Sequence, residues 1–180
     1  DQMLLDMNVP GHNFDVIDGL SYTIDLSQPA RFDLGGALVA PKAHRIRDLC
    51  HDGVPVSDDA EFVVAANSYR AYGGGPFRNL AETGLIHTCL RPVRDVLADH
   101  IAAQPRITPK PRRVWRFAAL PDTRVLFDTG PGLRAHPGEL ATLRAQDLGD
   151  TKHGFARLGL WIGSGQSDPT DHALSCESPI

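Results

Sequence analysis

The stretch LSYTIDLS at residues 20–27 alternates apolar and polar side chains without a break. Leucine, tyrosine, isoleucine and leucine occupy the even positions, and serine, threonine, aspartate and serine occupy the odd ones. Successive side chains of a strand point to opposite faces of a sheet, so this period of two predicts a half-buried strand. It is the clearest strand pattern in the chain, and Gln28-Pro29 ends it.

Other stretches predict further strands around this one. RIRDLCHDGVPV at 45–56 places an Asp52-Gly53 pair between two short runs, which is typical of a hairpin. A short continuous apolar run predicts a strand over 61–66. VWRFAAL (114–120) and RVLFDTG (124–130) predict a second pair of strands, and GFARLGLWIG (154–163) predicts the last one.

Two helices are predicted in the second half of the chain. In residues 91–104, apolar residues and one histidine fall on one helical face at Val93, Val96, Leu97, His100 and Ile101, and Pro105 ends the pattern. A second helix is predicted over 137–146, and residues 3–7 resemble the end of another. This order of strands, helix, strands, helix and strand favours an α+β fold with mixed sheets covered by two or three helices.

Length and composition limit the protein's class. The 180 residues suffice for one domain, predicted over 1–163 and followed by a flexible tail at 164–180. A net charge of -4 argues against a nucleic-acid polymer as partner but not against a single nucleotide, and no window is apolar enough to span a membrane. The three cysteines, Cys50, Cys89 and Cys176, form no CxxC pair and are predicted to be buried free thiols. Because the chain starts at Asp1 in mid-pattern, we expect it to be an N-terminally truncated fragment.

No catalytic motif is complete in the chain. Among the eight histidines there is no HExxH and no HxH spacing, and no GxSxG occurs. The sequence GGGPF at 73–77 lacks the Lys-Ser/Thr pair of a phosphate-binding loop. The sequence therefore predicts no catalytic residue and no metal ligand of its own.

The sequence AANSYRAYGGGPF at 65–77 places aromatic rings beside glycines. Tyr69 and Tyr72 could offer flat surfaces to a planar ligand, Gly73, Gly74 and Gly75 could leave room for it, and Asn67 could bind a base edge. The alternative is that a tyrosine packs in the core and the glycines form a turn, and the pattern alone favours this second interpretation.

Four blocks of the chain favour the binding interpretation instead, and they lie at 10–33, 62–77, 115–131 and 154–162. They include NFDVIDG and NSYRAYGGG, and in this order they resemble the C-terminal domain of bacterial 5'-nucleotidase-like enzymes. The resemblance is strongest to the periplasmic bifunctional 2',3'-cyclic-nucleotide 2'-phosphodiesterase/3'-nucleotidases.

The resemblance implies a role for the glycine-flanked stretch. In that family the C-terminal domain binds a nucleoside between two aromatic rings, and Tyr69 corresponds to one of them. The other ring would lie upstream of Asp1, and Phe14 stands where some relatives place a stacking phenylalanine. Asn67, Arg70 and Tyr72 would shape the rim of the pocket, and residues 73–75 would keep it open.

The resemblance also implies what lies outside these residues. Hydrolysis would belong to an N-terminal calcineurin-like metallophosphoesterase domain of the same polypeptide, which holds two divalent metal ions, in a periplasmic enzyme. The chain alone is therefore expected to be inactive. His12 replaces a tyrosine and Ser68 an asparagine of close relatives, which leaves the base preference open.

Two other functions remain open at this point. The parent enzyme could act mainly on 5'-nucleotides or nucleotide sugars, with the same fold and another substrate. Alternatively, the chain could be a non-catalytic ligand-binding or interaction module whose tyrosines and glycines only pack together.

Overall fold

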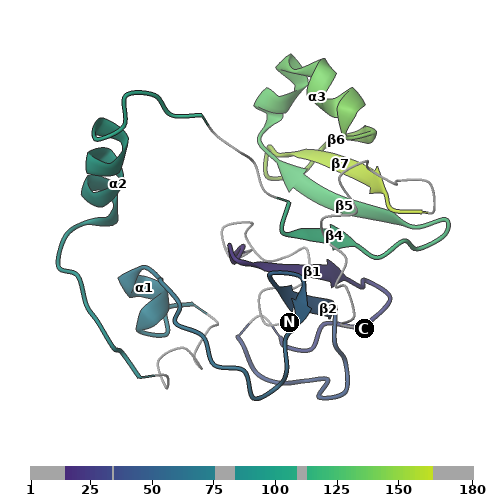
Figure 1. Ribbon diagram of the computed structural model, residues 1–180. Helices are drawn as coiled ribbons and strands as arrows, with labels where there is room; N and C mark the ends of the chain where they lie inside the picture. Colours follow the sequence, from purple (N-terminus) through teal and green to yellow (C-terminus); the bar gives the residue numbers. More distant parts are fainter. Residues whose placement is uncertain (1–14, 34, 76–83, 109–112, 164–180) are drawn as a thin grey trace.

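The computed structural model describes residues 15–33, 35–75, 84–108 and 113–163. The alternating stretch forms β1 (Leu20–Ile24), which lies inside a four-stranded sheet of order β3-β2-β1-β4 (Figure 1). β2 (Ile46–His51) and β3 (Val54–Pro55) run antiparallel to their neighbours, whereas β4 (Trp115–Phe117) joins β1 in parallel. This sheet is therefore mixed.

The predicted hairpin is confirmed by the pairing of β2 with β3. Cys50 faces Pro55 and His51 faces Val54 in an antiparallel register. Between them, Asp52 and Gly53 both have positive φ angles, 50° and 78°. Two successive left-handed residues are the geometry of a two-residue hairpin turn, which explains why an aspartate-glycine pair stands there.

The main core lies on one face of the first sheet. Tyr22 and Ile24 are buried, and the partly buried side chains of Leu26, Ile46, Leu49, Trp115 and Phe117 pack against them. The rings of Trp115 and Phe117 meet edge to face with their centroids 5.1 Å apart, an arrangement that aromatic pairs prefer. Tyr22 and Ile24 thus face this core as the period predicts, but Thr23 on the opposite face is also buried, so β1 is not the half-buried strand that was expected.

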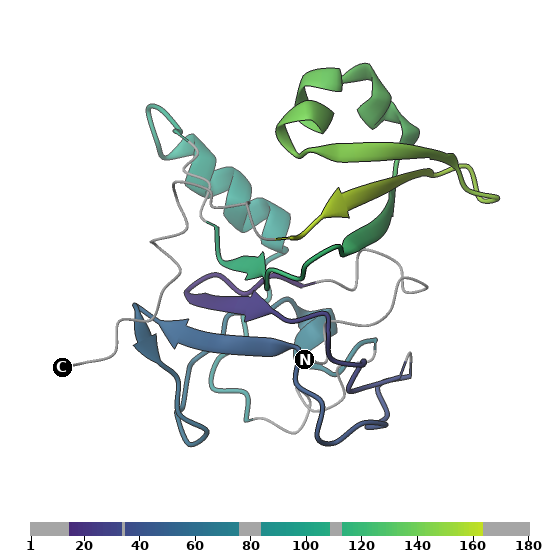
Figure 2. The same cartoon turned by 90° about the vertical axis from the view of Figure 1, so that its right-hand side faces the viewer.

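A second sheet has the order β5-β7-β6 and is antiparallel throughout. It contains β5 (Arg124–Thr129), β6 (Ala145–Asp150) and β7 (Ala156–Trp161), and Ala156 and Leu158 of the central strand are buried. The 3-10 helix η3 (Pro131–Ala135) and helix α3 (Pro137–Thr142) connect β5 to β6 and lie together on one side of this sheet (Figure 2). Ile162 links the sheet to the chain after β4, because its carbonyl accepts from Leu120 N at 2.9 Å.

Two predictions for the second half of the chain differ from the structure. The stretches 114–120 and 124–130 do form β4 and β5, but the two strands belong to different sheets. The helix expected over 137–146 ends at Thr142, and the chain continues as β6. Arg144 has a φ of 50°, which a helix does not tolerate, and the hydrogen bonds available along β7 outweigh the high helix propensity of Ala145 and Gln146.

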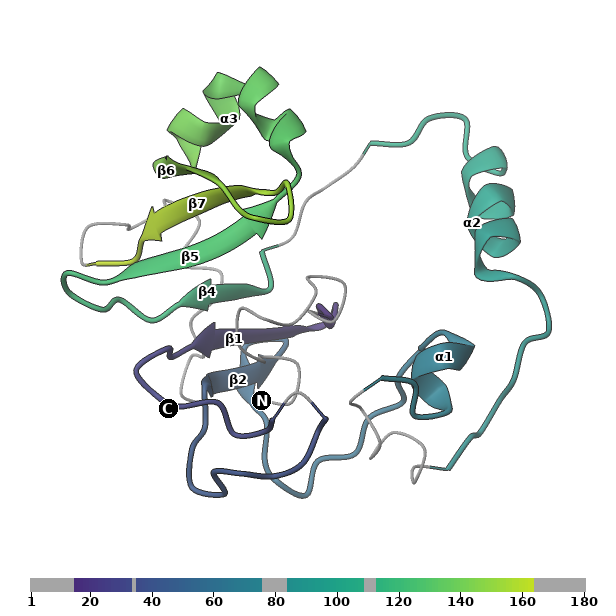
Figure 3. The same ribbon diagram turned by 180° about the vertical axis from the view of Figure 1, so that it is seen from behind.

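Helices α1 (Ser68–Ala71) and α2 (Val93–Ala102) stand apart from both sheets (Figures 1 and 3). The helix predicted over 91–104 is thus confirmed, yet its apolar face is exposed. We name the exposed apolar side chains of this region the apolar arc: Phe62, Val63, Val64, Leu85, Ile86, Leu90, Val93, Val96, Leu97 and Ile101.

The strand expected over 61–66 is not formed in the structure. These residues are exposed, and no neighbouring strand among the described residues offers its backbone groups to them. A strand needs such a partner, because its hydrogen bonds are made between chains rather than within one. The strand propensity of residues 61–66 led to the prediction, but propensity alone does not form a strand without a partner.

The α+β class is confirmed by two sheets and a few helices. Cys50 is buried and disulfide-bonded, and Cys89 is free but exposed, so the prediction of buried free thiols is wrong for both. Spacing along the chain does not show which thiols meet in the fold. Within the described ranges, no helix is long and apolar enough to cross a membrane. The expected tail, Cys176 and the helix end at 3–7 lie outside the described residues.

Candidate functional site

The candidate site is the turn formed by residues 67–75, which we call the Tyr69 corner. Asn67 caps the start of α1, because its side-chain oxygen accepts a hydrogen bond from Arg70 N at 2.9 Å. At the other end, Gly73 N donates to the carbonyl of Arg70 at 3.0 Å and Gly74 N to that of Tyr69 at 2.7 Å. This pair of bonds is a Schellman motif, which places a left-handed residue directly after the helix. Gly73, with a φ of 77°, supplies it.

The ring of Tyr69 lies directly against the backbone of Gly74. A Cβ atom built on Gly74 would stand 2.5 Å from Cδ2 and Cε2 of the ring, which is far inside van der Waals contact. The tyrosine is nevertheless 61% exposed. The second glycine of the triplet therefore lets the ring lie against the backbone, and more than half of the side chain remains exposed.

Arg70 points inward from the corner and is bound on several sides. Its Nε lies 2.6 Å from Oδ2 of Asp15, and a terminal nitrogen donates to Oδ1 of the same carboxylate at 3.2 Å. The other terminal nitrogen donates to the carbonyl of Gly74 at 3.2 Å. The guanidinium carbon stands 5.4 Å from the centroid of the Tyr69 ring, within cation-π range.

The other residues predicted for this site are distributed around the same turn. Tyr72 ends α1 as its C-cap and is exposed, and Gly75 has a φ of 75°. The side-chain oxygen of Asn67 is occupied by the cap, which leaves its amide nitrogen as the group that can donate to a ligand. Phe14 lies outside the described residues. The structure thus brings Asn67, Tyr69 and Arg70 together with the glycines in one exposed turn.

Asp15 is a site residue that was not singled out from the sequence. It belongs to the NFDVIDG block, but no periodicity or motif assigns it to Arg70, which lies 55 residues further along the chain. The two residues meet only because the segment before β1 passes the corner. A search of sequence spacing alone could not have found this ion pair.

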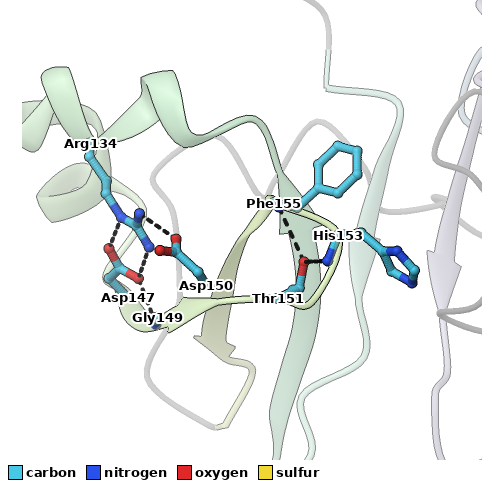
Figure 4. Close-up of polar contacts among 7 residues, drawn as sticks. All are labelled: Arg134, Asp147, Gly149, Asp150, Thr151, His153 and Phe155. Carbon is cyan, nitrogen blue, oxygen red and sulfur yellow. Dashed lines mark hydrogen bonds and ion pairs between the residues drawn. The ribbon is translucent and has the colours of Figure 1, made fainter.

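A second polar cluster joins η3 to β6 of the second sheet, and it shows an arginine whose bonds are purely structural (Figure 4). Arg134 of η3 binds both oxygens of Asp147, at 2.5 and 3.1 Å, and reaches Asp150 at 2.6 Å. These bonds, together with one from the backbone N–H of Gly149, lower the pKa of Asp147 to about 2. The cluster ties the helical connection to β6.

The turn that follows Asp150 holds itself by local bonds. The hydroxyl oxygen of Thr151 accepts from the backbone N–H groups of His153 and Phe155, at 3.4 and 3.2 Å (Figure 4). Arg134 and Thr151 are engaged in fixing the chain, so this region is a structural clamp.

The described residues do not fit a metal centre. Within them, no three side chains of histidine, cysteine, aspartate or glutamate gather closely enough to hold an ion. A two-metal phosphoesterase site needs several such ligands around each ion. The Tyr69 corner offers instead an exposed aromatic ring and the amide nitrogen of Asn67 as a donor.

Comparison with known proteins gives matches to nucleotide-cleaving enzymes. Residues 3–82 match the model of the family described as 5'-nucleotidase, C-terminal domain. The chain is 37% identical over 129 residues to a trifunctional nucleotide phosphoesterase of Bacillus subtilis, a match that covers 72% of the chain and 9% of that protein. No solved structure matches the chain significantly.

Two further relatives carry one name, 2',3'-cyclic-nucleotide 2'-phosphodiesterase/3'-nucleotidase. The relative from Salmonella typhimurium is 41% identical over 131 residues, covering 69% of the chain and 20% of that protein. The relative from Haemophilus influenzae is 35% identical over 154 residues, covering 81% of the chain and 23% of that protein. The chain thus spans about a quarter or less of the length of the relatives it matches.

Proposed function

Because the chain carries the 5'-nucleotidase C-terminal domain over residues 3–82, we propose that its Tyr69 corner binds the base of a nucleotide for a phosphoesterase of which this domain is one part. The observation that carries the proposal is the position of the Tyr69 ring. It lies against Gly74 and stays 61% exposed, so it would offer its solvent-facing surface to a purine or pyrimidine. A tyrosine that only packed in the core would be buried.

The corner would recognise a base mainly by stacking. Stacking on an aromatic side chain contributes about 1–3 kcal/mol per base and tolerates different bases. The amide nitrogen of Asn67 would add a donor for a base edge. A second aromatic ring outside the described residues would close the site from the other side, and Phe14 is one candidate for it.

The reaction proposed for the whole enzyme is hydrolysis of 2',3'-cyclic nucleotides and 3'-nucleotides, as the names of the relatives suggest. Two divalent metal ions would supply the attacking water and stabilise the leaving oxygen. We place them in a metallophosphoesterase domain outside these 180 residues, because the matches cover only 20–23% of those relatives. The part of this chain would be to hold the nucleoside so that its phosphate reaches that centre, and such positioning can lower a barrier by several kcal/mol.

The catalytic side of the proposal is tested with the isolated chain. It should release no product from 2',3'-cyclic AMP when Mn²⁺ or Co²⁺ is added, whereas the full-length protein should. Turnover by the chain alone would show that the active site lies within these residues. Comparing 3'-AMP with 5'-AMP on the full-length protein then separates the proposed substrates from 5'-nucleotides.

The apolar arc supports a larger assembly. Helix α2 presents its apolar face to solvent, and residues 62–64, elsewhere in the chain, are exposed as well. Contiguous exposed apolar surface marks an interaction site in soluble proteins. We place the metallophosphoesterase domain of the same polypeptide among the candidates to cover it, and hydrogen exchange should then be slower in α2 of the full-length protein than in the isolated chain.

We also propose a periplasmic location. The supporting observation is the disulfide bond at Cys50, because disulfides persist in oxidising compartments and are rare in the cytosol. Fractionation of cells that express the full-length protein tests this: recovery in the cytosolic fraction, with Cys50 reduced, would contradict it.

The decisive experiment for the base-binding role replaces Tyr69 in the full-length protein. Tyr69→Ala should weaken adenosine binding about 5- to 150-fold, which corresponds to the loss of one stacked base. Tyr69→Phe keeps the ring and serves as the matched control, with binding close to that of the unchanged protein. If adenosine affinity and the KM for 3'-AMP are the same in all three proteins, the corner only packs, and the interaction-module alternative is favoured.

A further inference from the structure

We propose that Arg70 is a positioning residue, which fixes the orientation of the Tyr69 ring by joining the Tyr69 corner to Asp15. The inference rests on the proposed function, because it concerns how the same base-binding ring is held. It assigns Arg70 and Asp15 to a pair that acts on the ligand through Tyr69 and not by touching it.

The corner needs such an anchor because it has little structure of its own. Helix α1 is four residues long, and none of its residues is buried. One helical turn is unstable by itself, since fixing its backbone yields only one or two hydrogen bonds. A ring that protrudes from such a turn keeps a defined direction only if something outside the turn holds it.

Arg70 is the side chain that provides this outside contact. Its side chain is 11% exposed, whereas the ion-paired side chains of Arg47, Arg91, Arg94, Arg134 and Arg157 are 36–88% exposed. It binds Asp15 through two nitrogens, which fixes both the distance and the plane of the guanidinium group. Asp15 in turn lies on the segment that leads into β1, so the corner is tied to the first sheet.

The same guanidinium group also contacts the Gly74 peptide and the Tyr69 ring. It donates to the carbonyl of Gly74, the residue on which the ring lies, and it stands 5.4 Å from the ring centroid. One planar group thus sets Asp15, the Gly74 peptide and the Tyr69 ring relative to each other. A lysine would keep the charge but could not make these contacts at once, because its ammonium group is a single point donor.

The test uses the full-length protein with Arg70→Lys and, as a second variant, Asp15→Asn. Each should weaken adenosine binding about 5- to 150-fold, as expected if the stacked ring is no longer held in place. The kcat/KM for 3'-AMP should fall by a similar factor, while turnover of bis(4-nitrophenyl) phosphate, an ester with no base, should stay unchanged. A general loss of structure would lower both activities, so their ratio separates positioning from misfolding.

Arg134→Lys is the matched control for these variants. Arg134 also binds one aspartate, Asp147, through two nitrogens, but this pair belongs to the second sheet and not to the Tyr69 corner. Its replacement should leave adenosine affinity unchanged. If it weakens binding as much as Arg70→Lys does, loss of any arginine pair has this effect and the assignment to Arg70 is wrong.

Combination with Tyr69→Ala completes the experiment. If Arg70 acts through the ring, Arg70→Lys should cause no further loss of adenosine affinity once the ring is absent. Additive losses would mean that Arg70 touches the ligand itself, and the positioning role would be refuted. If Tyr69→Ala weakens binding but the Arg70 and Asp15 variants bind normally, this inference alone fails. If Tyr69→Ala has no effect, the proposed function fails first.

Discussion

Replacing Gly74 with alanine should displace the Tyr69 ring from its support without removing any functional group of the corner. The added Cβ would lie 2.5 Å from Cδ2, Cε2 and the carbonyl oxygen of Tyr69, well short of the 3.4 Å at which ordinary contact begins. The carbonyl oxygen is held by its hydrogen bond from Gly74 N. The exposed ring can rotate away from the new Cβ, but the carbonyl oxygen belongs to the backbone, so we expect the turn at residues 69–74 to shift together with the ring.

The size of the effect differs between stability and binding. Overfilling a packed site costs about 1–3 kcal/mol, and the clash with the backbone carbonyl of Tyr69 means that the exposed ring alone cannot relieve this cost. Binding suffers more, because a displaced ring forfeits a stacking contribution of about 1–3 kcal/mol, or about 5- to 150-fold in affinity. Gly74→Ala therefore tests the position of the Tyr69 ring, because the ring itself keeps all its chemical groups.

The assay is calorimetric titration of the full-length protein with adenosine, accompanied by urea unfolding. Gly132→Ala is the matched control, because a Cβ at Gly132 meets nothing within 4 Å. It should bind adenosine normally. Should Gly74→Ala bind as tightly as the unchanged protein while Tyr69→Ala does not, the ring works without its glycine support and the geometric argument is refuted.

Three further predictions concern the scaffold. The pKa of Asp147 is lowered to about 2 mainly by the bonds from Arg134, so its stabilising effect is present above the ordinary value of about 3.9 and is lost as the pH falls from about 4 to about 2. Urea midpoints over that range should fall less steeply for Asp147→Asn, and equal slopes would show that the pair contributes nothing. Ile24→Ala should lower the free energy of unfolding by about 2–5 kcal/mol, because Ile24 is fully buried in the core, and a much smaller loss on urea unfolding would contradict that placement. In the native protein, an alkylating reagent detected by mass spectrometry should label Cys89 and reach Cys50 only after reduction, and early labelling of Cys50 would contradict its disulfide.

Several elements of the fold could be predicted from local patterns. The alternation at 20–27 gave β1, the Asp52-Gly53 pair gave the β2-β3 turn, and the helical spacing in 91–104 gave α2. Each of these patterns reflects the geometry of a single segment, in which side-chain period or turn conformation is set by neighbouring residues. Such features need no knowledge of what the segment later contacts.

The failed predictions all depended on partners. Residues 145–150 have a mixed pattern and became β6 because β7 lay beside them, whereas the more strand-like residues 61–66 found no neighbour among the described residues. β4 and β5 follow each other in sequence but joined different sheets. Strand hydrogen bonds are made between segments, so local propensity could not decide these cases.

The sequence by itself determined the α+β class, most of the local elements and the stretch in which tyrosines and glycines follow one another, because these depend on residues adjacent in the chain; that Tyr69 is exposed was decided by the tertiary structure. Only the tertiary structure decided which strands pair, that Cys50 is bonded, and that Arg70 reaches back to Asp15. Contacts between residues 55 positions apart depend on how the whole chain closes, and no period or motif in a single sequence records that closure.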